Sequence, residues 1–514
     1  MTFSDRGVSS GRTRILGLPK VAGRRVYFAA LGPMVFISCI FVAANLAIFS
    51  FPEAVFWDDW TLYGTQRAYV IGSFTESGFP HVGYLTWTLT FLGPGGVRVL
   101  VFFVGLSNAL LWFQILRVTP NIGLDSLVLS VALATSFPFF LARVATINTL
   151  SVIALFVFLF GWLAFLRGTI NRNRKGAILG LWFVFFSGIL YSAFVPMVLL
   201  VFLHVALVLY RSEREVPWKK IVTGMAVLLF MHGLVLSLQR IVFRPYGMYE
   251  GYRTILFGGG QIALFLIGVA ALLFFITLLT RREATSVRHY RYARAELAVF
   301  AIISFLLAVA SYTLMGSLPP YSEWQTRYEL NYFIPTTLLL IVIFESFDLK
   351  TSKKVFHSIA AILLVVTILH SNYLLSRFYV DWEKHSHVTE VLSSHSEQLV
   401  GTFVVVVDET AHLNAMGRQL RPYEWSGVLS DAIGTRNTFA VGASDFDGAV
   451  SSYLNGDFDR NLKAVYNYRW EDHAFPSDSV LVTISAQRGA SCGTLGFSIR
   501  NCIAVDINAG HLSG

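Results

Sequence analysis

Charged side chains are scarce in this chain. Only 14% of its 514 residues are Asp, Glu, Lys or Arg, whereas 55% are hydrophobic and the mean hydropathy is +0.60. Average globular domains carry roughly 25% charged residues, so this composition excludes a soluble chain. Apolar stretches of about 20 residues are typical of transmembrane helices. The sequence therefore predicts a polytopic α-helical membrane protein.

Several motifs that would indicate a particular chemistry are also missing. The C-terminal part has no P-loop, no dinucleotide fingerprint and no zinc-ligand spacing. Nucleic acid is excluded as a partner because no basic patch contains interleaved aromatic residues. The first 375 residues carry 30 Lys and Arg against 15 Asp and Glu, whereas the remaining residues carry 10 against 16. The excess positive charge thus lies in the membrane part, where it indicates topology.

Eleven apolar windows are predicted to cross the bilayer. They lie at 26–50, 97–116, 124–142, 145–166, 177–192, 194–210, 220–240, 256–280, 296–315, 331–346 and 355–375. Basic clusters recur after every second span, and cationic loops stay in the cytoplasm. We therefore expect a cytoplasmic N-terminal segment (1–25), a transmembrane core (26–375) and an outward-facing C-terminal domain (376–514). The absence of Asn-x-Ser/Thr sequons favours a bacterial inner membrane, with the C-terminal domain in the periplasm.

The C-terminal domain is rich in Asp, Ser, Gly and Asn and is long enough to fold as a unit. Strand-like runs at 402–407, at 480–484 and around 503–505 predict a small α/β or α+β domain. Cys492 and Cys502 both lie in this domain, and an oxidising compartment would join them in a disulfide. Two free thiols are the alternative.

Two adjacent carboxylates, Asp58 and Asp59, lie between tryptophans at the start of the first outward loop (52–96). Ionised side chains are costly near hydrocarbon, so this pair is a candidate functional site. Asp58 is our first choice as a catalytic base and Asp59 the second, because burial at the membrane face raises a carboxyl pKa toward working pH. Adjacent helical residues point about 100° apart, so we expect different roles for the two. The alternative is that one acid only caps a short helix over 59–71.

The order of features around these acids resembles the GT-C superfamily of integral membrane glycosyltransferases, in particular the protein mannosyltransferase and aminoarabinose transferase type. That pattern is a basic N-terminus, one span, and an outward loop with two acids followed by a tyrosine. The matching segments here are Trp57-Asp58-Asp59-Trp60-Thr61-Leu62-Tyr63, His81-Val82-Gly83-Tyr84-Leu85-Thr86-Trp87 and Gly93-Pro94. Gln325-Thr326-Arg327-Tyr328, with Pro335 after it, is similar to a late Arg-Tyr-x-x-Pro element of such enzymes. The Pro-Pro pair of the family is absent.

The resemblance implies an inverting glycosyltransferase that moves a sugar from a polyprenyl-phosphate donor to a periplasmic acceptor, namely an envelope polysaccharide, a lipid or a protein. This reaction needs a base for the incoming hydroxyl and cations for the leaving phosphate. Guanidinium groups bind phosphate through paired donors, although snorkelling to lipid headgroups is an alternative role for each arginine. The expected substrate-binding residues are Arg67, His81, Tyr84, Arg143, Arg240, Arg244, Arg327 and Tyr328.

The acidic pair could bind a divalent cation, Mg²⁺ or Mn²⁺, as a cofactor, although two adjacent acids without further ligands are a weak signal for a metal site. Two other classes remain as alternatives: a transporter or flippase of lipid-linked glycans, and an O-antigen polymerase or ligase. The few ionisable residues in the middle of the spans disfavour transport.

Overall fold

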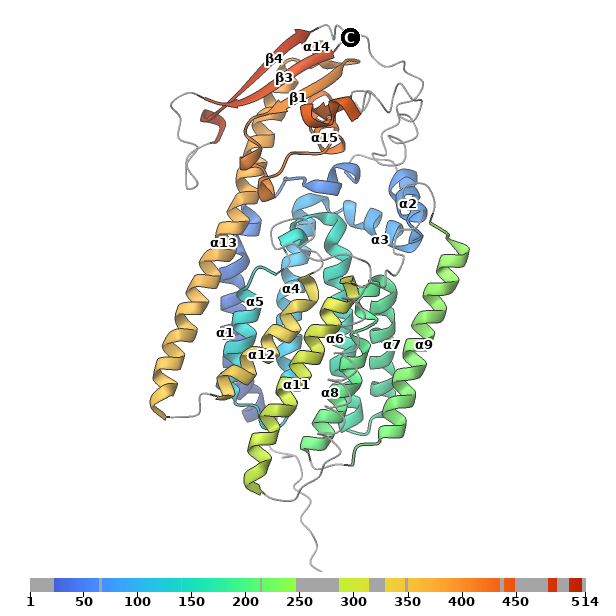
Figure 1. Cartoon of the computed structure of the whole chain (residues 1–514), viewed down its shortest axis with the longest axis vertical. Coiled ribbons are helices and arrows are strands. Elements are labelled where there is room, and N and C mark those ends of the chain that lie inside the picture. Colours follow the sequence, from blue (N-terminus) through green and yellow to red (C-terminus); the bar gives the residue numbers. More distant parts are fainter. Residues whose placement is uncertain are drawn as a thin grey trace, which may run out of the picture.

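The chain forms a tall bundle of helices with a small sheet domain at one end (Figure 1). This computed structural model describes residues 23–63, 67–139, 141–212, 215–245, 286–313, 329–346, 350–434, 439–448, 479–487 and 499–510. The expected fold class, a polytopic helical membrane protein with a C-terminal α/β domain, is confirmed.

The bundle consists of helices that coincide with the predicted spans. They are α1 (Gly23–Asn45), α4 (Gly93–Arg117), α5 (Leu124–Ser136), α6 (Thr149–Ile170), α7 (Arg174–Leu190), α8 (Val198–Arg211), α9 (Trp218–Val242), α11 (Ser286–Thr313), α12 (Phe333–Ser346) and α13 (Lys350–Ser394). Within the described residues, seven segments are long and apolar enough to cross a membrane, and α5 and part of α11 are shorter apolar helices. The predicted span at 256–280 lies outside the described residues.

Helix α5 is shorter than the span predicted over 124–142. It ends at Ser136, and Phe137 adopts an extended backbone. Pro138 explains this end, because proline disfavours helical backbone in the residue before it and donates no backbone hydrogen bond. The chain therefore turns near Pro138 instead of crossing further.

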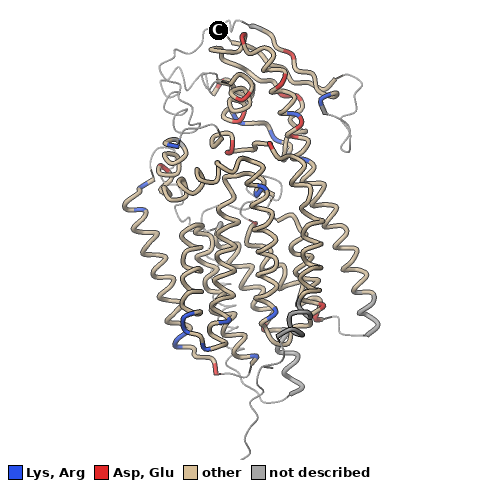
Figure 2. The backbone as a smooth tube through the Cα atoms, turned by 180° about the vertical axis from the view of Figure 1, so that it is seen from behind, with Lys and Arg blue, Asp and Glu red and all other residues tan. Residues whose placement is uncertain are grey.

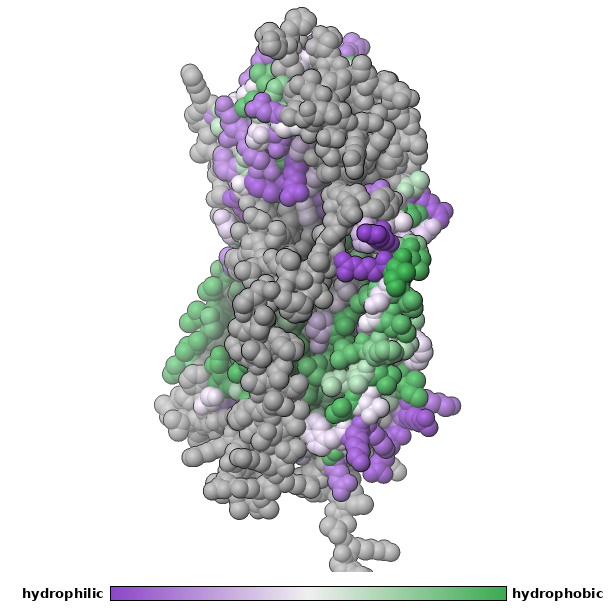
Figure 3. Space-filling model, turned by 45° about the vertical axis from the view of Figure 1, so that its right-hand side comes forward, coloured by the Kyte–Doolittle hydropathy of each residue, from purple (hydrophilic) through white to green (hydrophobic). Residues whose placement is uncertain are grey.

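The surface of the bundle fits a bilayer. Apolar side chains form a belt over the middle of the molecule on the face in Figure 3, with polar side chains above and below it. Basic residues at the end of α6 and at the starts of α7 and α9 gather at the end remote from the sheet domain (Figure 2). This is the end that the charge pattern predicts to be cytoplasmic.

Helices α6 and α7 pack with almost no space between their backbones. A Cβ atom added to Gly161 of α6 would lie 2.7 Å from the backbone nitrogen of Val184 in α7 and 2.8 Å from the carbonyl oxygen of Gly180. Small residues allow such close contact between membrane helices, where van der Waals packing replaces the hydrophobic effect.

In its described residues, the C-terminal domain contains a four-stranded sheet with the order β2-β1-β3-β4. Its strands are β1 (Phe403–Asp408), β2 (Phe439–Gly442), β3 (Ser479–Ala486) and β4 (Ile503–Gly510). β1 pairs in parallel with β2 and β3, and β4 is antiparallel to β3. Helix α15 (Pro422–Ile433) lies between β1 and β2 in the chain and packs on this sheet. The three predicted strands are confirmed as β1, β3 and β4.

Helix α13 is 45 residues long and continues from the bundle into the sheet domain (Figure 1). The predicted domain boundary at 376 therefore falls inside an unbroken helix. A short helix, α14 (Ser396–Leu399), follows it and leads to β1.

The first outward loop lies between the bundle and the sheet domain (Figure 1). It contains a 3-10 helix, η2 (Trp57–Thr61), and two α-helices, α2 (Arg67–Glu76) and α3 (Pro80–Thr90). The expectation of one helix over 59–71 is wrong. The 3-10 helix ends at Thr61, whose hydroxyl bonds back to the carbonyl oxygen of Asp58 at 2.7 Å, and a new helix begins at Arg67.

Candidate active site

Asp59, in the 3-10 helix η2 of the outward loop, is buried, with 1% of its surface exposed. Its carboxylate oxygens accept hydrogen bonds from the backbone N–H groups of Thr146 at 2.6 Å and Ile147 at 2.9 Å. These residues begin η4 (Thr146–Asn148), which leads directly into α6. The first N–H groups of a helix lack partners within it and form its positive end. Asp59 therefore caps η4, the 3-10 helix that leads into α6 and is distant in sequence from the helix considered above.

Burial dominates the ionisation of Asp59. It raises the pKa of this carboxyl from 3.8 to about 7, although the two backbone N–H groups and the nearby Arg98 guanidinium act in the opposite direction. Asp59 is thus poised to gain or lose a proton near neutral pH. Both of its oxygens, however, are held by the start of α6, and little of its surface is accessible to a substrate.

Asp58 faces the sheet domain. It is half-buried, and its Oδ1 accepts a hydrogen bond from the hydroxyl of Tyr423 at 2.7 Å. Tyr423 belongs to α15, and burial together with the negative charge of Asp58 raises its pKa, so it remains a protonated donor. The two acids therefore contact different parts of the protein, and the expectation that they have different roles stays a prediction.

Arg98 fixes the segment that leads into the two acids. Its guanidinium donates to the carbonyl oxygens of Pro52 and Ala54, and it lies 5.0 Å from the ring centre of Phe51 and 5.5 Å from that of Phe56. Only 1% of Arg98 is exposed. This buried cation, held by carbonyl groups and aromatic faces, sets the path of the chain before Asp58.

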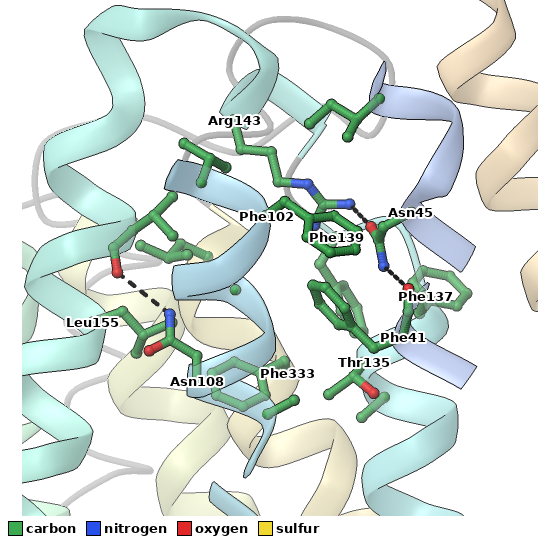
Figure 4. A pocket seen from close by; sticks show the side chains of 17 residues that line it. Phe41, Asn45, Phe102, Asn108, Thr135, Phe137, Phe139, Arg143, Leu155 and Phe333 are labelled. Atoms are coloured by element: carbon green, nitrogen blue, oxygen red, sulfur yellow. Dashed lines mark hydrogen bonds between the residues drawn. The ribbon is translucent and has the colours of Figure 1, made fainter. Parts of the chain in front are cut away.

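Arg143 lies at one end of a cavity in the bundle (Figure 4). The cavity has a volume of about 80 Å³, and α1, α4, α5, α6 and α12 contribute to its walls. Arg143 donates to the Oδ1 of Asn45, whose Nδ2 in turn donates to the carbonyl oxygen of Phe41 at 2.8 Å. Burial lowers the pKa of Arg143 to about 10, so this group remains a cation at neutral pH.

The cavity below Arg143 is largely aromatic and aliphatic. Its phenylalanine walls are Phe41, Phe102, Phe137, Phe139 and Phe333. Two polar residues, Asn108 and Thr135, also line it (Figure 4). An apolar hollow with a cation at one end has the character of a site for an amphipathic anion.

One short segment joins this cavity to the acidic loop. Arg143 lies in η3 (Leu141–Val144), three residues before Thr146, which binds Asp59. Three peptide units span at most about 11 Å between Cα atoms. The segment from Leu141 to Asn148 therefore carries, close together in the chain, the cation Arg143 and the backbone N–H groups that bind Asp59.

Arg67, Tyr84 and His81 lie on the two helices of the loop. The Arg67 guanidinium is 5.5 Å from the ring centre of Tyr84 and 4.8 Å from that of Trp87, so Arg67 and Tyr84 are brought together. The Nε2 of His81 lies 3.2 Å from the carbonyl oxygen of Ile189, to which it donates, and burial lowers the pKa of this histidine. His81 thus connects α3 to the end of α7. Substrate binding by these three residues stays a prediction.

Arg240 and Arg244 are exposed, and neither lines the cavity of Arg143. Helix α9 ends at Val242, so the condition for the two arginines to share one helix face is not met. Arg327, Tyr328 and Cys492 lie outside the described residues, so their predicted roles, including the disulfide with Cys502, stay predictions.

Asn45, Arg98 and Tyr423 were not predicted as site residues. Arg98 had a recognisable signal, because it is a lone arginine at the start of an apolar span. Tyr423 had none, since 365 positions separate it from Asp58. Among the described residues, no group of three or more His, Cys, Asp or Glu side chains is placed to hold a metal ion.

No protein-family model matches the chain, and no curated protein matches its sequence. Among solved structures, the chain is similar to the archaeal oligosaccharyltransferase AglB from Archaeoglobus fulgidus, in complex with an inhibitory peptide and a dolichol-phosphate. The identity is 12% and the TM-score 0.40, and the match covers 90% of this chain and 70% of that chain.

Proposed function

We propose that this protein is an inverting glycosyltransferase of the GT-C type, which transfers a sugar from a polyprenyl-phosphate donor to a periplasmic acceptor of the cell envelope. The acceptor class is a polysaccharide, a lipid or a protein. The proposal rests above all on one observation: the segment from Leu141 to Asn148 carries both the buried Arg143, which lines the cavity, and the backbone N–H groups that bind Asp59, the neighbour of Asp58.

Asp58 is the base in this proposal. The acceptor hydroxyl oxygen attacks the anomeric carbon, its proton passes to the Asp58 carboxylate, and the bond from that carbon to the phosphate oxygen breaks with its electron pair remaining on the phosphate. One displacement with one base inverts the anomeric centre. Asp58 suits this role better than Asp59, because it is only half-buried, whereas both Asp59 oxygens are engaged by the start of α6.

Arg143 binds the donor phosphate in this proposal. Its guanidinium stabilises the charge that returns to the phosphate as the sugar leaves, and it does so without donating a proton. Asn45 orients it, and the phenylalanine-lined cavity accommodates the first part of the polyprenyl chain. The charged head and the apolar tail of the donor thus match the two ends of this site.

No step of this reaction is routed through a metal ion. The oxygens of Asp59 are occupied by backbone N–H groups, and one oxygen of Asp58 by Tyr423, so the pair is not a ready set of cation ligands. A divalent cation remains a prediction from the sequence. If sugar transfer continues at the wild-type rate after treatment with a chelator, the prediction of a divalent cation is wrong.

The decisive experiment replaces Asp58 by Asn in the purified full-length protein reconstituted with lipid-linked sugar donors. Asn is similar in shape and retains an oxygen that can accept from Tyr423, but it cannot take the proton. We expect sugar transfer to be lost, with donor binding and thermal unfolding unchanged. Asp125→Asn is the matched control, because Asp125 is an exposed acid in the first turn of α5, and it should transfer sugar at the normal rate.

The same experiment separates the proposal from its alternatives. If Asp58→Asn forms product at the wild-type rate, the base is elsewhere, and an O-antigen polymerase or ligase acting through later loops becomes the better explanation. If the wild-type protein moves lipid-linked glycans across a vesicle membrane without transferring sugar, it is a transporter. A reporter fused after Ser394 tests the orientation, since activity on the cytoplasmic side would contradict a periplasmic site.

A further inference from the structure

The sheet domain is fixed to α13 by a buried lysine. The Nζ of Lys384 in α13 donates to both carboxylate oxygens of Asp408 at 2.8 and 2.7 Å, to the carbonyl oxygen of Thr410 at 3.1 Å and to Oδ1 of Asn414 at 2.6 Å. Lys384 has 0% of its surface exposed. A buried ion pair with this many hydrogen bonds is well satisfied, so the loop after β1 has one position relative to the helix.

That loop in turn fixes the start of α15. Arg418 donates to both carboxylate oxygens of Glu424, and Glu424 also accepts from the backbone N–H of Arg421 at 2.9 Å. Only 2% of Glu424 is exposed. The residue before it, Tyr423, is therefore carried on a helix start that is held by a two-pronged ion pair.

Helix α15 meets the acidic loop through a glycine. A Cβ atom added to Gly427 would lie 2.7 Å from the indole ring of Trp60, so only glycine lets the two surfaces approach this closely. On the preceding turn of α15, Tyr423 is 4% exposed and donates its hydroxyl to Asp58. Among the described residues, Glu424 and Arg421 are further charged groups near this hydroxyl.

From this arrangement we propose that Tyr423 is a positioning residue for the Asp58 carboxylate, so that the C-terminal domain completes the active site instead of only covering it. This inference rests on the function proposed above. The hydroxyl holds one carboxylate oxygen and thereby fixes the plane of the group. It also favours the ionised form, which is the form that accepts a proton. A reaction at Asp58 then depends on the docking of α15.

The test is Tyr423→Phe in the full-length protein, which removes one oxygen and leaves the ring in place. A hydrogen bond to a charged group corresponds to a change of roughly ten- to a hundredfold, so we expect kcat to fall by that factor. The acid limb of the pH profile of kcat should move to higher pH, because Asp58 loses a donor that favours its ionised form. The donor KM should stay the same, since Arg143 is untouched.

Two further variants separate positioning from a structural role. Ser430→Ala removes a hydroxyl from the same helix, which donates to the carbonyl oxygen of Ser426 within α15, and it should leave kcat and the pH profile unchanged. Gly427→Ala keeps the Tyr423 hydroxyl but forces Trp60 and α15 apart, so it should reproduce the shifted pH profile. If Tyr423→Phe does not fold, Gly427→Ala tests the same inference in its place.

The outcomes distinguish this inference from the function on which it rests. If the wild-type protein transfers no sugar, the proposed function fails. If the wild-type protein is active and Tyr423→Phe, with normal thermal unfolding, retains the wild-type kcat and pH profile, then Tyr423 does not position Asp58 and the inference is overturned. A lower kcat with an unshifted pH profile overturns it as well, because a purely structural defect reduces activity at every pH.

Discussion

The ionisation of Asp59 predicts how the stability of the protein changes with pH. The pKa of this carboxyl is raised from 3.8 to about 7 in the fold. A carboxyl whose pKa is higher in the folded than in the unfolded state binds its proton more tightly when folded. Stability therefore falls as the pH rises from about 4 to about 7, and the contribution of this group is constant above that.

The size of this effect follows from the pKa difference. Each pKa unit corresponds to about 1.4 kcal/mol, so the full difference amounts to about 4 kcal/mol, of which about 3 kcal/mol falls between pH 5 and pH 8. Asp59→Asn cannot titrate. Its amide leaves one of the N–H groups of Thr146 and Ile147 without an acceptor, which costs about 1–3 kcal/mol at every pH. We thus expect the variant to be less stable than the wild type at pH 5 and to lose most or all of that deficit at pH 8.

Thermal unfolding of the purified protein in detergent, at pH 5 and pH 8, measures this change directly. Asp125→Asn is again the control. Because Asp125 is exposed, its replacement should change the unfolding temperature by the same small amount at both pH values. The prediction is wrong if the unfolding temperatures of Asp59→Asn and the wild type differ by the same amount at pH 5 and at pH 8. It would mean that Asp59 does not change its protonation between these values.

Three further predictions concern the donor site, the sheet domain and the bundle. Arg143→Gln removes the cation at the cavity, so the donor KM should rise at least tenfold, measured with the lipid-linked sugar. Lys384→Met leaves the Asp408 carboxylate buried without its partner, which costs about 3–5 kcal/mol and should appear as an early unfolding transition of the sheet domain in proteolysis experiments. Gly161→Leu forces α6 away from Val184, so folded protein in the membrane fraction should fall sharply relative to wild type, as fluorescence size exclusion would show.

Much of the architecture was predictable from local pattern. Apolar windows locate membrane helices because every backbone polar group in a bilayer must be satisfied within its own segment. The strands β1, β3 and β4 were predicted because buried valine and isoleucine runs are short and bounded by polar residues. The end of α5 at Ser136 was missed, although Pro138 carries the signal for it.

The site was only partly predictable, because its contacts join residues far apart in the chain. The acidic pair was recognised from its place beside a span, but the sequence does not show that Asp59 binds the start of α6. Likewise, Tyr423 reaches Asp58 only after α13, the sheet and α15 are folded. Long-range contacts of this kind depend on the packing of whole elements and leave no periodic pattern in the sequence.

Helix α13 belongs to both the bundle and the sheet domain, so a tilt of this one helix would move the sheet domain relative to the bundle. Forty-five residues of α-helix extend for about 68 Å, so a rotation of only 5° about the midpoint would carry the far end sideways by about 3 Å. That excursion is as large as the whole distance between the Tyr423 hydroxyl and Asp58. A tilt of α13 in the surrounding lipid would therefore displace the sheet domain, and Tyr423 with it, from the acidic loop by about the length of that hydrogen bond.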